Sequence, residues 1–219
     1  MIDDQWQAFL RSYRGRHHGE LRQDLFALFA TEHKPQGFFV EFGAMDGLRA
    51  SNTLLLEREY GWQGIMSEPN PRYNHALPGN RACRIDLRCV SDTTGQKVKF
   101  QCADQAGWPG MVGHILNEHK SQGKVIEVET VTLNDLLDQH HAPRQVDYIS
   151  VDTDGSEPMI MQGFDFSRHS ATAWTIEHNQ MPWRQDICEL MQRNGYVRVL
   201  EKFSGYDDWY LQKSLAERL

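Results

Sequence analysis

Short apolar segments alternate with helical segments along most of the chain, and this alternation limits the fold more than any other feature. Six segments are rich in apolar and β-branched residues and end in polar or turn residues, which is typical of strands. Strands that alternate with helices form parallel sheets covered on both faces. The sequence therefore predicts an α/β protein with a Rossmann-like, mostly parallel, seven-stranded sheet flanked by helices. The strands are expected at residues 38–42, 61–69, 82–91, 146–152, 171–179 and 196–203, with a last strand at 208–214.

The residues before the first strand are expected to be helical as well. Apolar side chains keep helical spacing in two groups, and Gly15 and Gly19 separate the groups. We therefore expect an N-terminal helical cap over residues 1–36 and the main domain over residues 37–219. The segment 97–103 is expected to pair near an edge of the sheet.

Residues 103–127 form the longest stretch without a regular pattern. A loop of this length in a compact domain is usually a lid, a binding loop or disordered. We expect this segment to be a lid over the site, with Trp108, Pro109 and Met111 as part of an apolar wall.

Composition excludes several classes of function. The formal net charge is −7, which argues against a broad nucleic-acid-binding surface. No apolar run approaches the length of a membrane span, and the start, MIDDQWQAFLRSYRGRHH, is not typical of a signal peptide. The four cysteines form no CxxC pair, which is typical of free thiols in a reducing compartment. We expect a cytoplasmic protein, and a homodimer is left open.

The turn after the first strand is the first candidate binding site. Ligands in open α/β sheets bind beyond the carboxyl ends of the strands, and here that end reads EFGAMDG, from Glu41 to Gly47. Met45 stands where a dinucleotide fingerprint needs a glycine, and two acids would repel a pyrophosphate. A cationic ligand such as S-adenosylmethionine would suit Glu41 and Asp46, while Gly43 would let the backbone approach it. Alternatively, both acids only cap the next helix.

The second strand ends in SEPNP, which places Glu68 at its carboxyl end. A carboxylate there can accept hydrogen bonds from the two hydroxyls of a ribose. This position suits any nucleoside cofactor, so Glu68 alone does not separate NAD from S-adenosylmethionine.

Three separated motifs resemble the FkbM family of S-adenosylmethionine-dependent methyltransferases. These are FVEFGAMDG, then SEPNP, then VDYISVDTDGSEPMIMQGFDF, in the order of the family and covering roughly residues 37–179. Met45-Asp46 and Asp154-Gly155-Ser156 depart from the commoner family residues. The resemblance implies a methyltransferase domain over residues 37–219, with the methionine part of the cofactor near the first turn, its ribose near Glu68 and its adenine near the third strand. The cofactor contacts implied are Glu41, Gly43, Ala44, Asp46, Gly47, Asn52, Glu68, Pro69, Val90, Ser91 and Asp152.

Acidic and polar residues follow the fourth and fifth strands, whose ends are expected to be neighbours. Methyl transfer to a hydroxyl requires removal of the hydroxyl proton by a base or a metal. His178 is the candidate base, and Asp152 and Glu157 are further candidate catalytic residues. Asp152, Glu177 and Asn179 are instead candidate oxygen ligands for Mg²⁺. For each of these residues a structural role, such as helix capping or packing, is the alternative.

The favoured function is S-adenosylmethionine-dependent methylation of a hydroxyl on a small molecule or sugar unit. One alternative is an NAD(P)-dependent oxidoreductase of nucleotide sugars, and another is a non-catalytic nucleoside-binding protein. The sequence leaves open the identity of the acceptor, the choice between O- and N-methylation and the need for a metal.

Overall fold

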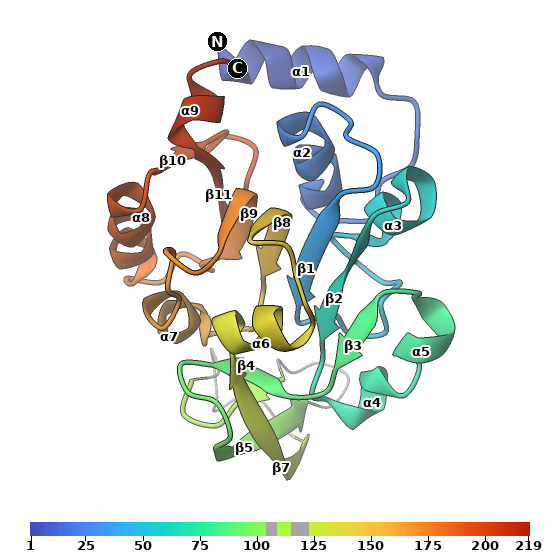
Figure 1. Cartoon of the computed structure of the whole chain (residues 1–219), viewed down its shortest axis with the longest axis vertical. Helices are drawn as coiled ribbons and strands as arrows, with labels where there is room; N and C mark the ends of the chain where they lie inside the picture. Colours follow the sequence, from blue (N-terminus) through green and yellow to red (C-terminus); the bar gives the residue numbers. More distant parts are fainter. Residues whose placement is uncertain (104–108, 115–122) are drawn as a thin grey trace.

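The computed structural model describes residues 1–103, 109–114 and 123–219, which form two sheets with helices around them (Figure 1). The main sheet has seven strands in the order β10-β11-β9-β8-β1-β2-β3. Neighbouring strands pair in parallel, except that β11 runs antiparallel to both β9 and β10. The predicted α/β fold is therefore present, with a mixed main sheet. Its strands are β1 Phe38–Phe42, β2 Gln63–Ser67, β3 Arg84–Asp86, β8 Gln145–Val151, β9 Ser170–Glu177, β10 Tyr196–Val199 and β11 Asp207–Gln212.

A second sheet was not predicted from the sequence. It has four strands in the order β4-β7-β5-β6, and it extends from the end of the molecule opposite the two chain termini (Figure 1). The strand β4 pairs with β7 in parallel, whereas β5 pairs with β7 and β6 in antiparallel fashion. The sheet lies beyond the carboxyl end of β2 and β3, so it can cover one side of that edge. Its strands are β4 Cys89–Ser91, β5 Lys97–Ala103, β6 Gly110–Met111 and β7 Gly123–Thr132.

The single strand predicted over 82–91 is wrong, because the chain turns in its middle. Asp86 accepts hydrogen bonds from the backbone nitrogen of Arg88 at 2.9 Å and from Nε of the same residue at 2.9 Å. His140 Nε2 lies 2.9 Å from the second oxygen of Asp86. This local turn ends β3 in the main sheet and starts β4 in the second sheet.

The prediction of an irregular segment at 103–127 is also wrong in part. Residues 110–111 form β6, and 123–127 begin the long strand β7. The alternation in KVIEVE was a strand signal, since Ile126 and Val128 pack inward while Glu127 and Glu129 are exposed. Trp108 lies outside the described residues.

Helices cover both faces of the main sheet. One apolar core includes Val40 and residues of α6, α7 and α8, and the other includes Phe39 and residues of α1, α2 and α3. Adjacent residues of β1 thus enter opposite cores, as expected for a strand buried on both faces. The helices are α1 Ile2–Ser12, α2 Gln23–Ala30, α3 Leu54–Tyr60, α4 Pro71–Asn74, α5 Leu77–Asn80, α6 Leu133–Gln139, α7 Glu157–Gln162, α8 Arg184–Arg193 and α9 Lys213–Ala216.

The N-terminal helices belong to one of these covering layers. Every residue of α2 is buried, and the helix contacts β9 and α3. On α1, Trp6 is 1% exposed and its ring meets those of Trp209 and Phe29 at centroid distances of 5.7 and 5.5 Å. The division into residues 1–36 and 37–219 stays a prediction. Among the described residues, the helices are too short or too polar to cross a bilayer.

Candidate active site

A cavity of about 910 Å³ lies at the carboxyl ends of the parallel strands. This volume is within the range of small-molecule and cofactor sites. Residues from the ends of β1, β2, β8 and β9 line it, together with residues of the second sheet and residues from both ends of the chain. The lining includes Glu20, Gln23, Gly43, Met45, Asn52, Glu68, Pro69, Cys89, Val90, Phe100, Met111, Asp152, Asp154, Glu177, Asn179 and Tyr206.

Gly43 lets the exits of β1 and β8 approach each other. Its φ is +67°, and a Cβ placed on it would lie 1.9 Å from the carbonyl oxygen of Asp152. A side chain at this position would therefore collide with backbone that cannot move aside cheaply. The sequence predicted that the backbone at Gly43 approaches a ligand, and this stays a prediction; the structure shows a close approach to the residue that follows β8.

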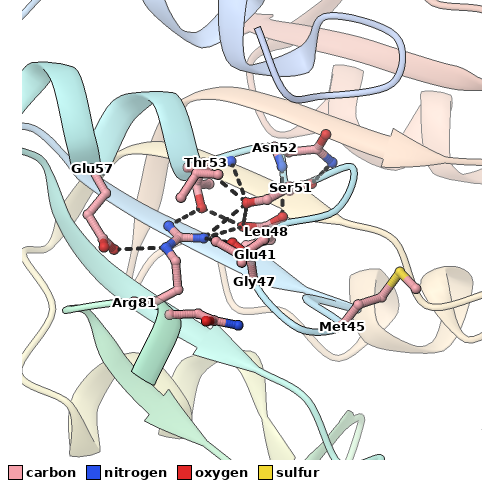
Figure 2. A network of polar contacts seen from close by, with 12 residues as sticks. Glu41, Met45, Gly47, Leu48, Ser51, Asn52, Thr53, Glu57 and Arg81 are labelled. Carbon is pink, nitrogen blue, oxygen red and sulfur yellow. Dashed lines mark hydrogen bonds and ion pairs between the residues drawn. The ribbon is translucent and has the colours of Figure 1, made fainter. Parts of the chain in front are cut away.

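Glu41 is the centre of a buried polar network rather than a member of the cavity lining (Figure 2). Its Oε1 accepts a hydrogen bond from the backbone nitrogen of Asn52 at 2.8 Å. Its Oε2 accepts hydrogen bonds from the hydroxyls of Ser51, at 3.0 Å, and Thr53. Glu41 is 3% exposed, so these bonds offset the cost of burying its charge. The carboxylate holds the loop between β1 and α3.

Arg81 completes this network and was missed by sequence reasoning. Its side chain is fully buried, and Nη1 lies 3.7 Å from Glu41 Oε2. The guanidinium donates to the carbonyl of Gly47 at 3.1 Å, to Ser51 Oγ at 3.0 Å and, through Nε, to Glu57 Oε2 at 3.1 Å (Figure 2). Arg81 follows the short helix α5, and no local motif marks it as important.

Three further residues of the predicted cofactor turn support its shape. Asp46 Oδ1 accepts hydrogen bonds from the backbone nitrogens of Leu48 and Arg49, both at 3.0 Å, so it is a turn acid. Ala44 is 2% exposed and packs in the core. Gly47 has a φ of +76°. Asp46, Ala44 and Gly47 lie outside the cavity lining.

Asn52, in contrast, reaches the cavity. Its amide nitrogen donates to Ser150 Oγ at 2.9 Å. Within the described part of the chain, its Oδ1 is buried without a hydrogen-bond partner. Asn52 therefore offers an unused acceptor beside the glycine turn.

Glu68 and Pro69 lie where the sequence placed them, at the end of β2 in the cavity wall. Glu68 Oε2 accepts a hydrogen bond from the backbone nitrogen of Met45 at 2.9 Å, and Oε1 accepts one from that of Asn70 at 2.8 Å. Burial raises the pKa of Glu68 to about 7, and the two backbone donors oppose this rise. A second hydrogen-bond site remains on each oxygen.

Near Glu68 the wall is apolar. Val90 and Cys89 of β4 contribute to it, and the second sheet adds Phe100 and Met111. Ser91, also predicted to contact the base, lies outside the lining, and its hydroxyl donates to Asp92 at 3.3 Å. Met111 of β6 lies in the wall, as expected for the segment 103–127, whereas Phe100 of β5 was not predicted to reach it.

Three carboxylates gather at the exits of β8 and β9. One oxygen each of Asp152, Asp154 and Glu177 lie within 4.8 Å of one another. Burial and repulsion between neighbouring acids raise the pKa of all three, to about 7 for Asp154 and about 9 for Glu177. Glu177 is 7% exposed, and among the described residues its Oε2 has no hydrogen-bond partner. We refer to these three residues as the acid cluster.

Glu157 stabilises the turn that carries Asp154, a member of the acid cluster. It is fully buried and lies outside the cavity lining. Its Oε1 accepts from the backbone nitrogen and the hydroxyl of Thr153, at 2.7 and 2.9 Å, and its Oε2 accepts from the nitrogen of Gly155 at 3.0 Å. Glu157 thereby fixes the turn that carries Asp154, whose φ is +58°.

The structure separates His178 from its neighbours Glu177 and Asn179. Glu177 and Asn179 line the cavity, whereas His178 lies outside the lining. His178 is the first residue after β9, and its Nε2 lies 3.6 Å from Asp208 Oδ1. Burial lowers the pKa of His178, although Asp208 opposes this effect. We therefore do not assign it the role of base in the cavity.

Comparison with known proteins identifies the family. The family model described as the methyltransferase FkbM domain matches residues 41–198. Among curated proteins, none matches the sequence significantly. A precorrin-6y C5,15-methyltransferase from Geobacter metallireducens GS-15 is similar in structure, with a TM-score of 0.47 and 13% identity over 86% of this chain and 87% of that chain.

Two other solved structures are similar to a lesser degree. An S-adenosylmethionine-dependent methyltransferase from Geobacter sulfurreducens, in complex with S-adenosyl-L-homocysteine, has a TM-score of 0.43 and 8% identity over 88% of this chain and 70% of that chain. The [4+2]-cyclase SpnF has a TM-score of 0.43 and 10% identity over 99% of this chain and 76% of that chain. The family match covers most of the chain and the three motifs from Glu41 onward, so the chain belongs to the FkbM family of methyltransferase domains.

Proposed function

We propose that this protein is an S-adenosylmethionine-dependent methyltransferase that methylates a hydroxyl group of a small molecule or sugar unit. One observation carries the proposal. A single cavity joins a buried carboxylate at the exit of β2 to a cluster of three carboxylates at the exits of β8 and β9. The first suits a ribose, and the second suits positive charge. Membership of a methyltransferase family supports the same conclusion.

The described residues fit the cofactor. Glu68 would accept hydrogen bonds from the ribose hydroxyls at its free sites, and Val90 with Phe100 would flank the adenine. The amide oxygen of Asn52 would meet a donor of the methionine part. When bound, S-adenosylmethionine supplies an electrophilic methyl group on a positively charged sulfur. Glu41 would act indirectly, by holding the loop that carries Asn52.

For activation of the acceptor we propose the acid cluster in place of His178. Asp152, Asp154 and Glu177 would hold a divalent cation such as Mg²⁺, with Asn179 beside them in the cavity wall. The unpartnered Oε2 of Glu177 supports this assignment, because a buried oxygen without a hydrogen-bond partner is open to a bound ion or water. A bound divalent cation lowers the pKa of a coordinated hydroxyl. Asp154 enters this ligand set from the structure, since the sequence suggested Asp152, Glu177 and Asn179.

A binding experiment tests the cofactor. Calorimetric titration should show binding of S-adenosylmethionine and S-adenosylhomocysteine and no binding of NAD or NADP. Glu68→Ala should weaken binding by about tenfold, the value of one or two hydrogen bonds to a charged group. Ser91→Ala is the matched control and should bind normally. Tight binding of NAD instead would support the oxidoreductase alternative.

Chelation tests the metal. Methyl transfer from labelled cofactor should fall on treatment with EDTA and return when Mg²⁺ is added. Asp154→Asn should lower turnover far more than cofactor affinity. Full activity in EDTA would exclude the metal and leave a carboxylate of the cluster as the proton acceptor. Cofactor binding without any turnover would support a non-catalytic protein.

A further inference from the structure

We propose that Glu20, Gln23 and Tyr206 form the acceptor subsite and that this subsite takes an uncharged ligand rich in hydroxyl groups, such as a sugar ring. The inference rests on the proposed methyltransferase function, because it assigns the end of the cavity that the cofactor leaves free. All three residues line the cavity. Sequence reasoning identified none of them.

The strand order places these residues away from the nucleoside end. Along the edge of the sheet the cavity passes from β2 to β1, β8, β9 and β11. Glu68 ends β2, whereas Tyr206 directly precedes β11, whose first residue pairs with Glu177. Four strand spacings of about 4.8 Å separate the two ends by roughly 19 Å. The acid cluster lies between them, where a methyl group would pass from one ligand to the other.

Tyr206 is held in place at both ends. Its carbonyl oxygen accepts hydrogen bonds from the backbone nitrogens of His178 at 2.8 Å and Asn179 at 3.1 Å. Its hydroxyl donates to Glu20 Oε2. The subsite wall is therefore built before any ligand arrives.

The segment before α2 is fixed against the same wall. Gln23 is 3% exposed, and its Nε2 donates to Asp207 Oδ2 at 2.9 Å. A Cβ on Gly19 would lie 2.9 Å from Asn52 Oδ1, so the N-terminal segment packs closely on the loop after β1. The wall thus joins the two ends of the chain to the cofactor turn.

These residues lie on both sides of the family domain. The FkbM model covers residues 41–198, so Glu20, Gln23 and Tyr206 are all outside it. A cavity wall that the family model does not include is a suitable place for the features that distinguish one acceptor from another.

The chemistry of the wall indicates the class of ligand. A carboxylate, a primary amide and a phenol ring offer hydrogen-bond acceptors, donors and an aromatic face, which suit the hydroxyls and the ring of a sugar. The carboxylate of Glu20 would repel an anion. The cofactor and the divalent cation of the proposed function balance the charge of the cluster, so the acceptor needs no charge of its own.

The test uses saturation-transfer NMR on the full chain with S-adenosylhomocysteine present. The probes are methyl glycosides of glucose, galactose and mannose, with glucosamine and glucose 6-phosphate as charged counterparts. At least one uncharged glycoside should receive saturation from the wild-type protein. Glu20→Ala and Tyr206→Phe should weaken its binding by about fivefold, the value of one hydrogen bond. Glu217→Ala, an exposed acid on the last helical turn, is the control.

Cofactor affinity keeps the two proposals apart. Calorimetry should give the same affinity for S-adenosylhomocysteine in wild type, Glu20→Ala and Tyr206→Phe. Saturation of only glucosamine or glucose 6-phosphate would overturn the ligand class. Saturation of none of the sugars, or equal saturation with the wild type and the variants, would overturn the subsite. Failure of the wild type to bind S-adenosylhomocysteine would instead overturn the proposed function itself.

Discussion

At the scale of single residues, the candidate site depends on groups that never touch the cavity. Glu41 and Arg81 form an ion pair with each other and hydrogen bonds with the loop after β1. Glu157 accepts hydrogen bonds from the turn that carries Asp154. The sequence showed that Glu41 lies near the end of an apolar strand, but it could not show which way the side chain points. That direction depends on Arg81, a residue 40 positions away, so local pattern alone could not predict it.

Gly43→Ala should disable the site. The added methyl group would lie 1.9 Å from the carbonyl oxygen of Asp152, and φ is +67°, which favours glycine. We expect a loss of about 2–4 kcal/mol in the free energy of unfolding and little cofactor binding. Urea denaturation and calorimetry measure the two effects. Gly95→Ala is the matched control, since its φ is +80° and the space around it is open. Equal losses in both variants would show that strain alone, and not the contact with β8, is responsible.

Arg81→Met should weaken the protein more than a surface arginine would. The substitution leaves Glu41 buried without its ion pair, a change that typically costs about 3–5 kcal/mol. Chemical denaturation of Arg81→Met and of Arg49→Met, an exposed position, provides the comparison. Similar stability of the two variants would contradict the role of Arg81 as the charge partner of Glu41 in the network.

Glu68 should make stability depend on pH. Its pKa is raised from 4.5 to about 7 in the folded state, so the folded state binds the proton more tightly than the unfolded state. Stability from this group is therefore complete below pH 4.5, is lost as the pH rises to about 7, and is constant above. The loss amounts to about 3 kcal/mol. Glu68→Gln should reduce the slope in denaturation experiments between pH 4 and pH 8 and leave the part due to Asp154, whose pKa is also raised to about 7. An unchanged slope would show that Glu68 does not contribute.

At the scale of elements, the sequence predicted what local periodicity determines. Strands β1, β2, β8 and β9, their exits and the FkbM motifs were found, and membership of the family is confirmed. The second sheet was not found, because its pairing depends on a turn at 86–88 and on contacts between strands distant in sequence. His178 was misplaced for a related reason, since periodicity identifies a strand end but not the residue at which the chain turns away.

The turn between β3 and β4 connects the two sheets, and loss of its hydrogen bonds should lower the local stability of the second sheet. Although burial raises the pKa of Asp86, hydrogen bonds from Arg88 and His140 lower it more, to about 2. Arg88→Ala should increase hydrogen exchange in β4 and β7 by about tenfold while β1 and β8 keep their protection. Lys97→Ala, which removes an exposed ion pair of the same sheet, is the control. Uniform loss of protection in both sheets would mean that they unfold as one unit.

At the scale of the whole molecule, segments from the N-terminal and C-terminal parts of the chain pack together on the main sheet. Helix α1 lies across the end of the sheet near the two termini (Figure 1). Glu20 and Gln23, which follow α1, and Tyr206, which precedes β11, line the cavity. A sequence pattern could assign each end as helix or strand, but it could not show that they share a wall.

Trp6→Ala tests how much this closure contributes. Trp6 is 1% exposed against Trp209, and truncation of a buried tryptophan costs about 3–5 kcal/mol. The variant should unfold at lower urea concentration, yet still bind S-adenosylhomocysteine at low temperature. Gln7→Ala, on the exposed side of the same helix, should change neither property. If Trp6→Ala were as stable as the wild type, packing of α1 would not contribute to the stability of the fold.

The reversed direction of β11 has a consequence for how related enzymes diverge. The strands β1, β2, β8 and β9 each bring to the cavity residues that follow them, whereas β11 brings a residue that precedes it, Tyr206 at the end of the loop 200–206. Insertions or deletions there would reshape the proposed acceptor side while leaving the register of the sheet and the glycine turn after β1 unchanged. The antiparallel strand β11 would thus allow the proposed acceptor specificity to change while the carboxyl edge of the parallel strands stays the same.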